Sequence, residues 1–189
     1  MNKSKLSLAT DLVHAHLSRI SSILFVGVTG SVSYGKPSID DDIDIMIITE
    51  KHTLWFTRLF LRLYIFFYHI PHRIYGHPER PNEFCFNLWL DVSALTVPRI
   101  RQNSRIASDL VHLIPLYNRE NTYEKLMLAN SWAKKYHHLP KVKKINNSLN
   151  FENYLLSFSN ILFFLPQYFF MLFKMKNEIV TTHSAYFHS

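Results

Sequence analysis

Cysteine is almost absent from this 189-residue chain, in which Cys85 is the only one. An internal disulfide is therefore excluded, and a reducing compartment, the cytoplasm, is the simplest expectation. The lone thiol also excludes zinc sites built on cysteine pairs, and the spacing of His72 and His77 matches no zinc motif. Cys85 lies in an apolar run, where we expect a small core residue.

Glycine is scarce as well, with four residues against a hydrophobic fraction of 48%. This composition predicts a folded, globular chain, long enough for one domain with a sizeable core and a small appendage. Residues 1–20 contain no continuous apolar stretch, because Asp11 and His14 interrupt them, so no signal peptide is expected. The sequence shows no internal repeat.

Acidic residues are fewer than basic ones, 14 against 21, which gives a formal net charge of +7. The excess is concentrated in residues 116–189, where nine Lys and Arg face four Asp and Glu. Such a charge attracts nucleotide phosphates, nucleic acid or anionic lipid, or it is simply a solvated basic face. A nucleic-acid-binding role has little support, because no known binding module is present.

Against this background, two carboxylates open an apolar run in residues 42–48, Asp-Ile-Asp-Ile-Met-Ile-Ile. In the first four of these residues polar and apolar side chains alternate with period 2, so Asp42 and Asp44 are predicted to share one face of a strand. Two neighbouring carboxylates repel each other unless a cation lies between them, and oxygen ligands suit Mg²⁺ or Mn²⁺. Asp40 and Asp41 are expected to be loop or cap residues. The alternative is that Asp40, Asp41 and Asp42 form a solvated turn and that Asp44 is an exposed strand residue.

A Gly-Ser pair stands shortly upstream, at Gly30 and Ser31, after a β-rich run over residues 23–28. Glycine at a strand end allows close approach of a ligand, and serine adds a hydroxyl and a backbone N–H that can hold a phosphate oxygen. Lys36, in the following loop, either reaches a triphosphate or is loop surface. The stretch thus combines a phosphate-binding and a metal-binding element, as transfer of a nucleotidyl or phosphoryl group requires.

This pattern of Gly30-Ser31 followed by Asp42-Ile43-Asp44 in a hydrophobic strand resembles the signature of the nucleotidyltransferase superfamily typified by DNA polymerase beta. Over residues 20–140 the layout also resembles an uncharacterised bacterial branch of nucleotidyltransferase-domain proteins. The resemblance implies an α/β (α+β) fold, with a small mixed sheet flanked by helices. It further implies an enzyme that binds an NTP, ATP included, together with Mg²⁺ or Mn²⁺.

The resemblance also implies a role for each site residue. Gly30 and Ser31 would hold the β- and γ-phosphates, and Asp42 and Asp44 would ligate the metal ions. The family usually carries a third carboxylate on a later strand, for which Asp91 is the candidate, as metal ligand and as general base on the acceptor hydroxyl. Alternatively, Asp91 is a residue that caps the end of its strand.

The periodicity predicts helices and strands in alternation. We expect helices over residues 5–18, 52–69, 99–113 and 121–138, strands over 23–28, 43–49 and 83–95, and an edge strand or turn at 115–117. We expect a catalytic domain over residues 1–115 and a helical C-terminal region over 116–189, with 177–189 as a frayed tail.

Residues 151–173 are strongly apolar and long enough to span a bilayer, although Pro166 should kink or split a helix there. We favour helices that pack on the catalytic domain or on a partner over membrane insertion.

Three functional hypotheses follow. The first is transfer of an NMP from an NTP to an unknown acceptor, a protein, an RNA or a small molecule, with release of pyrophosphate. The others are an inactive NTP-binding regulatory scaffold, and a membrane-associated protein that acts through residues 151–173.

Overall fold

A computed structural model describes residues 4–74, 77, 80–142, 154–173, 175 and 178–187. Residues 143–150, which follow the helix expected over 121–138 and contain Lys143 and Lys144, lie outside these ranges, as do residues 151–153 at the start of the apolar segment. The elements in chain order are α1 (Lys5–Ala15), η1 (Leu17–Arg19), β1 (Ile23–Val28), α2 (Gly30–Ser33), β2 (Ile43–Thr49), α3 (Leu54–Tyr68), β3 (Phe84–Asp91), η2 (Arg99–Arg101), α4 (Ser104–His112), β4 (Ile114–Asn118), α5 (Thr122–Ala129), η3 (Ser131–Lys135), α6 (Tyr154–Leu172), β5 (Ile179–Val180) and β6 (Ser184–Tyr186).

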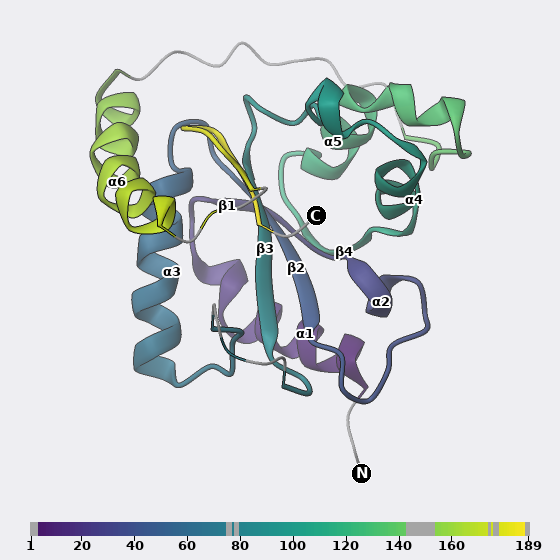
Figure 1. The fold of residues 1–189 in the computed structure, drawn as a ribbon, viewed down its shortest axis with the longest axis horizontal. Coiled ribbons are helices and arrows are strands. Elements are labelled where there is room, and N and C mark those ends of the chain that lie inside the picture. The colour runs from purple at the N-terminus through teal and green to yellow at the C-terminus, as the bar shows by residue number, and fades with distance from the viewer. Residues whose placement is uncertain are drawn as a thin grey trace.

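One mixed sheet organises the fold, with strand order β4-β1-β2-β3-β6-β5 (Figure 1). β2 and β3 run parallel and are joined through α3, whereas the other neighbouring strands are antiparallel. The expected mixed α/β architecture, a mixed sheet flanked by helices, is confirmed. The central place of β1 and β2 explains why both read as almost continuous apolar runs.

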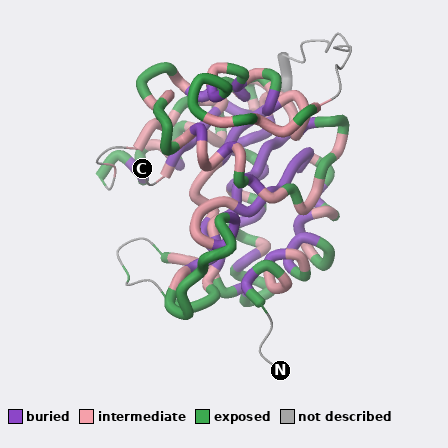
Figure 2. Tube along the Cα trace, turned by 90° about the vertical axis from the view of Figure 1, so that its right-hand side faces the viewer, coloured by how far each residue is buried: buried purple, intermediate pink, exposed green. Residues whose placement is uncertain are grey.

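The two faces of the sheet carry separate cores. On one face, β2 contributes Ile43, Ile45 and Ile47, which pack with α1, α3 and α6. On the other face, Met46 and Ile48 pack with α4 and α5. Burial is concentrated along the strands, and the helices turn their exposed sides to solvent (Figure 2). Strand alternation thus sends successive residues of β2 into different helical layers.

The apolar segment forms α6, which lies beside α3 (Figure 1). Its few polar residues make the contact specific. Asn160 Oδ1 accepts from Trp55 N at 3.0 Å, and Gln167 accepts from Arg58 Nη1 at 2.9 Å and donates to Trp55 O at 2.8 Å. Pro166 was expected to kink or split the helix; the helix continues through it, so the split is wrong. Among the described residues, no helix is both long enough and apolar enough to cross a bilayer.

The C-terminal part departs from expectation in two ways. Residues 179–186, expected as a frayed tail, form the hairpin β5–β6, and β6 pairs with β3 from Leu88↔Tyr186 to Leu90↔Ser184. The expected division at residue 115 falls inside β4, which pairs with β1. The region 116–189 is therefore not purely helical, because it supplies strands to both ends of the sheet.

Candidate functional site

The Gly-Ser pair and the acidic pair meet where β1 ends and β2 begins. Antiparallel pairing of Val28 with Ile45 brings the two chain segments together, and Thr29 N donates to Asp44 O at 3.0 Å. Gly30 has a φ of +64°, and a Cβ built there would collide with the Asp44 carboxylate. Only glycine can occupy this position without strain or clash, so the backbone of residue 30 directly faces Asp44.

Asp42 and Asp44 converge, as their spacing predicts. Asp42 is 8% exposed and its Oδ2 accepts from Arg73 Nη1 at 3.0 Å. Asp44 is half-buried, and its Oδ1 accepts from Asn87 Nδ2 at 2.5 Å. Asp42, Asp44 and Cys85 each offer a ligand atom, and these atoms lie within 4.8 Å of one another. The solvated-turn alternative does not describe Asp42, which is buried and charge-paired.

Cys85 is the register partner of Asp44 on β3 and is 4% exposed. Burial, and after it the charges of Asp44 and Asp42, raises the pKa of the Cys85 thiol. The thiol therefore stays neutral and is a poor ligand for a hard cation. The oxygen donors available to Mg²⁺ or Mn²⁺ at this site are the two carboxylates and, with its amide turned, Asn87.

Asp91 does not belong to this site, which corrects the expected carboxylate triad. In the parallel register Asp44 pairs with Cys85, whereas Asp91 pairs with Thr49 at the other end of β2. Six residues of strand separate Cys85 from Asp91, about 20 Å at a rise of about 3.3 Å per residue. Asp91 instead accepts from the backbone N–H groups of Ser93 and His52, so the alternative interpretation as a strand-end cap is confirmed.

The loop between α2 and β2 is held by Lys5, a residue that sequence patterns did not single out. Lys5 is 9% exposed, and its Nζ donates to Ile39 O at 3.0 Å, to Asp41 O at 2.6 Å and to Asn82 Oδ1 at 3.1 Å. Lys5 thus fixes the chain that leads directly into the acidic pair.

Asp41 caps the same loop, as expected. Its Oδ2 accepts from Ser38 N at 2.8 Å. Hydrogen bonds from the Ser31 hydroxyl and from Ser38 N lower the pKa of Asp41. Lys36 is exposed, and its backbone N–H donates to Ser31 O at 3.2 Å. The Ser31 hydroxyl is therefore engaged within the loop by its hydrogen bond to Asp41.

A cavity of about 610 Å³ is lined by residues that contact the acidic pair, although Asp42 and Asp44 themselves do not line it. Arg73, which donates to Asp42, and Asn87, which donates to Asp44, both line it, together with Arg58 and Arg62 from α3. Burial, and after it the charge of Arg62, lowers the pKa of Arg58. Aromatic side chains complete the wall, so the cavity can accommodate a ligand with an anionic group and a flat apolar part.

No protein-family model matches the chain, and no curated protein matches it either. The assignment of a function therefore depends on the residues and geometry described above.

Proposed function

We propose that this chain is a metal-dependent nucleotidyltransferase, which moves a nucleoside monophosphate from an NTP to an acceptor hydroxyl and releases pyrophosphate. One observation carries the proposal: Gly30 abuts Asp44 beside the buried carboxylate of Asp42. Because residue 30 has no side chain, the Asp44 carboxylate lies directly against the backbone of the Gly-Ser pair. A cation held by the two carboxylates would therefore be next to a backbone that can bind a phosphate oxygen. The fold type that accompanies the proposal is the small mixed sheet of the polymerase beta-like enzymes.

In this proposal Asp42 and Asp44 hold Mg²⁺ or Mn²⁺. The bound ion would stabilise the negative charge that develops on the phosphoryl oxygens. Gly30 and Ser31 orient the β- and γ-phosphates through their backbone N–H groups. Arg73 donates to Asp42 and lines the cavity, so its guanidinium is near enough to the pair to neutralise a phosphate of a nucleotide bound there. The identity of the base and of the acceptor stays open.

The residue that stands where a third carboxylate would be expected favours a second candidate, an NTP-binding regulatory scaffold without turnover. Asn87 of β3 donates to Asp44, and an amide cannot take the proton of an acceptor hydroxyl. If the chain is an enzyme, the carboxylate pair or water would have to accept the proton of the acceptor hydroxyl. In the scaffold, the same residues bind the nucleotide and no transfer follows.

Pyrophosphate release separates the two candidates. The assay uses each of the four NTPs with Mg²⁺ or Mn²⁺ and cell extract as the acceptor source. For the enzyme, we expect release by the wild type and a loss of about 100-fold or more in Asp44→Asn, since metal coordination contributes several kcal/mol. Asp40→Asn is the matched control, because this residue belongs to the same acidic run but lies outside the cluster. Equal activity of Asp44→Asn and the wild type would overturn the proposal.

Asn87→Asp sharpens the comparison, because it supplies the missing carboxylate at the position that contacts Asp44. If the wild type binds NTP by calorimetry without release, and Asn87→Asp gains release, the native chain is a scaffold. If the wild type already releases pyrophosphate, the site is active with the Asn87 amide in place. No nucleotide binding by either protein would contradict both candidates.

Docking of the α3–α6 face to a membrane surface or a protein partner has one supporting observation. Eight phenylalanines of α3, of α6 and of the residue after α6 are exposed, which is unusual for a solvated surface, namely Phe56, Phe60, Phe66, Phe67, Phe158, Phe169, Phe170 and Phe173. Flotation with anionic vesicles tests the membrane form, and Phe169→Ser with Phe170→Ser should abolish it. Wild-type protein that never floats would exclude the membrane form.

A further inference from the structure

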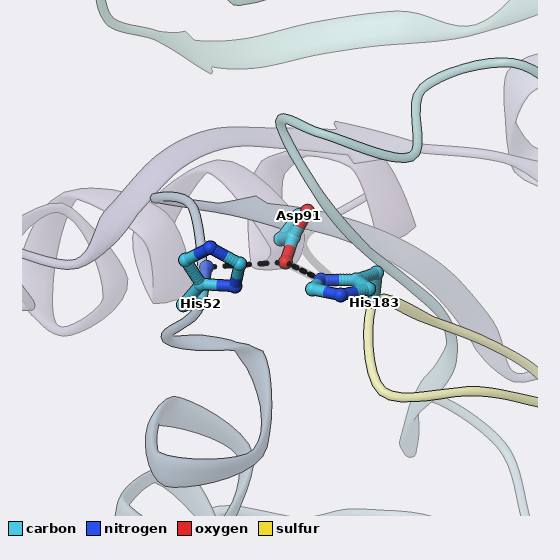
Figure 3. Close-up of side chains that lie close together, drawn as sticks. All are labelled: His52, Asp91 and His183. Carbon is cyan, nitrogen blue, oxygen red and sulfur yellow. Dashed lines mark hydrogen bonds and ion pairs between the residues drawn. The ribbon is translucent and has the colours of Figure 1, made fainter. Parts of the chain in front are cut away.

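We propose that His52, Asp91 and His183 form a binding site for a divalent transition-metal ion, Zn²⁺ foremost, at the opposite end of β3 from the acidic pair (Figure 3). The three residues come from the β2–α3 turn, the last position of β3 and the β5–β6 turn. Each offers one ligand atom, and the three atoms lie within 4.8 Å of one another. This inference does not depend on the proposed transferase.

Asp91 is the anchor of the site. Its carboxylate is fully buried, at 0% exposure, and its two oxygens have different partners. Oδ1 accepts from Ser93 N at 2.8 Å and from Ser93 Oγ at 2.5 Å, whereas Oδ2 lies 2.7 Å from His183 Nδ1 and 3.2 Å from His52 N. Ser93 thus orients the carboxylate, and Oδ2 faces the histidines as the oxygen ligand.

The two imidazoles approach Asp91 from opposite sides, with ring centroids 5.1 Å apart (Figure 3). His52 has a φ of 62°, in the left-handed region that residues other than glycine rarely adopt. Such a backbone conformation is retained where the surrounding structure imposes it, and it often marks a functional position. Here the backbone N–H of His52 donates to Asp91 Oδ2, and its imidazole lies beside the carboxylate (Figure 3).

The donor set selects the class of metal. Two imidazole nitrogens and one carboxylate oxygen suit Zn²⁺ and its neighbours in the first transition row, whereas Mg²⁺ prefers oxygen ligands throughout. Ligand atoms around tetrahedral Zn²⁺ stand about 3.3 Å apart, and the three ligand atoms here already lie within 4.8 Å of one another. The His183 side chain is 34% exposed, which leaves a fourth position open to water.

A Ser-His-Asp catalytic triad at the same place does not fit the geometry. In a triad, the acid and the nucleophile use different nitrogens of the histidine. Here Asp91 Oδ2 at 2.7 Å and Ser93 Oγ at 3.4 Å both approach Nδ1 of His183. Ser93 moreover donates to Asp91, so its hydroxyl orients the carboxylate.

Titration of the metal-free full chain with Zn²⁺, against a competing chromophoric chelator, tests the site. We expect a one-to-one complex with sub-micromolar affinity in the wild type. His52→Gln and His183→Gln should each weaken binding about 100-fold, because each removes a ligand, and circular dichroism verifies that both variants fold. Asp91→Asn is avoided as the main test, since the loss of a buried acceptor threatens folding.

His14→Gln is the matched control, because the chain has 11 histidines and His14 is exposed and outside the cluster. Asp42→Asn with Asp44→Asn separates the two candidate sites and should leave Zn²⁺ binding unchanged. In the Co²⁺ complex, visible absorption bands of a four-coordinate ion should appear in the wild type and be lost in His183→Gln. Wild-type binding that survives both histidine substitutions, or no stoichiometric binding at all, would overturn the site.

Discussion

At position 30 a single methyl group determines whether the acidic pair can stay where it is. Gly30→Ala introduces strain at positive φ, about 1–2 kcal/mol, and a clash with the Asp44 carboxylate. We expect both a lower urea midpoint and a loss of NTP binding or turnover. Gly35→Ala is an informative control, because Gly35 has a φ of +71° but no atom within 4 Å of an added Cβ. If the two variants lose function equally, contact with Asp44 is not what matters.

A pH dependence belongs to Cys85. Burial raises the pKa of the folded-state thiol above its ordinary value of 9.0, so the folded chain keeps a proton that the unfolded chain loses. This contribution to stability is complete below pH 9 and declines as pH rises above it, by up to about 1.4 kcal/mol per pH unit. Urea unfolding of wild type and Cys85→Ala between pH 7 and 10 should show a steeper alkaline decline in the wild type. Parallel curves would contradict this assignment.

The site residues that could be predicted from the sequence are those whose positions are set by neighbouring residues in the chain. Gly30, Asp42 and Asp44 could be predicted, because a turn and a period-2 strand fix them within a few positions of chain. Arg73 and Asn87 could not, since only the pairing of β2 with β3 brings them to the carboxylates. Asp91 was misassigned because alternation predicts the face of a strand but says nothing of the position along it.

Among the elements, α6 shows how few polar atoms fix an apolar helix. Asn160 is 1% exposed, accepts from Trp55 N and donates to Thr182 O at 2.8 Å. Asn160→Leu should therefore lower the free energy of unfolding by about 1–3 kcal/mol, because two buried backbone groups lose their partner. Phe158→Leu, at a position that is 68% exposed, should change it little. Equal urea midpoints for Asn160→Leu and the wild type would show that packing alone holds α6.

Strands of ordinary length were predictable, and very short ones were not. β1 and β2 agree with the expected ranges 23–28 and 43–49 to within a residue. β5 has two residues and β6 three, too few for any periodicity, and β6 is defined by its pairing with β3. These two strands form because they pair at the edge of β3, so the local sequence alone does not predict them.

At the scale of the whole molecule, β6 and β5 cover the edge of β3, which would otherwise present unpaired backbone groups beside the apolar side chains of Leu88 and Leu90. A variant lacking residues 178–189 should therefore associate, and light scattering after size exclusion should detect oligomers or aggregate. Removal of residues 188–189 alone is the control and should leave the elution volume unchanged. A monomeric, stable variant without the hairpin would show that the edge is protected by other means.

The distance along the chain between the hairpin and β3 has a consequence for synthesis. Asp91 and His183 are 92 residues apart, so β3 leaves the ribosome long before the strand that covers its edge exists. During that interval, β1, β2 and β3 can already assemble, because the helix that connects the parallel pair precedes β3 in the chain. The nascent protein then displays an open strand edge for many seconds, and we expect it to depend on chaperones in the cell more than its small size suggests.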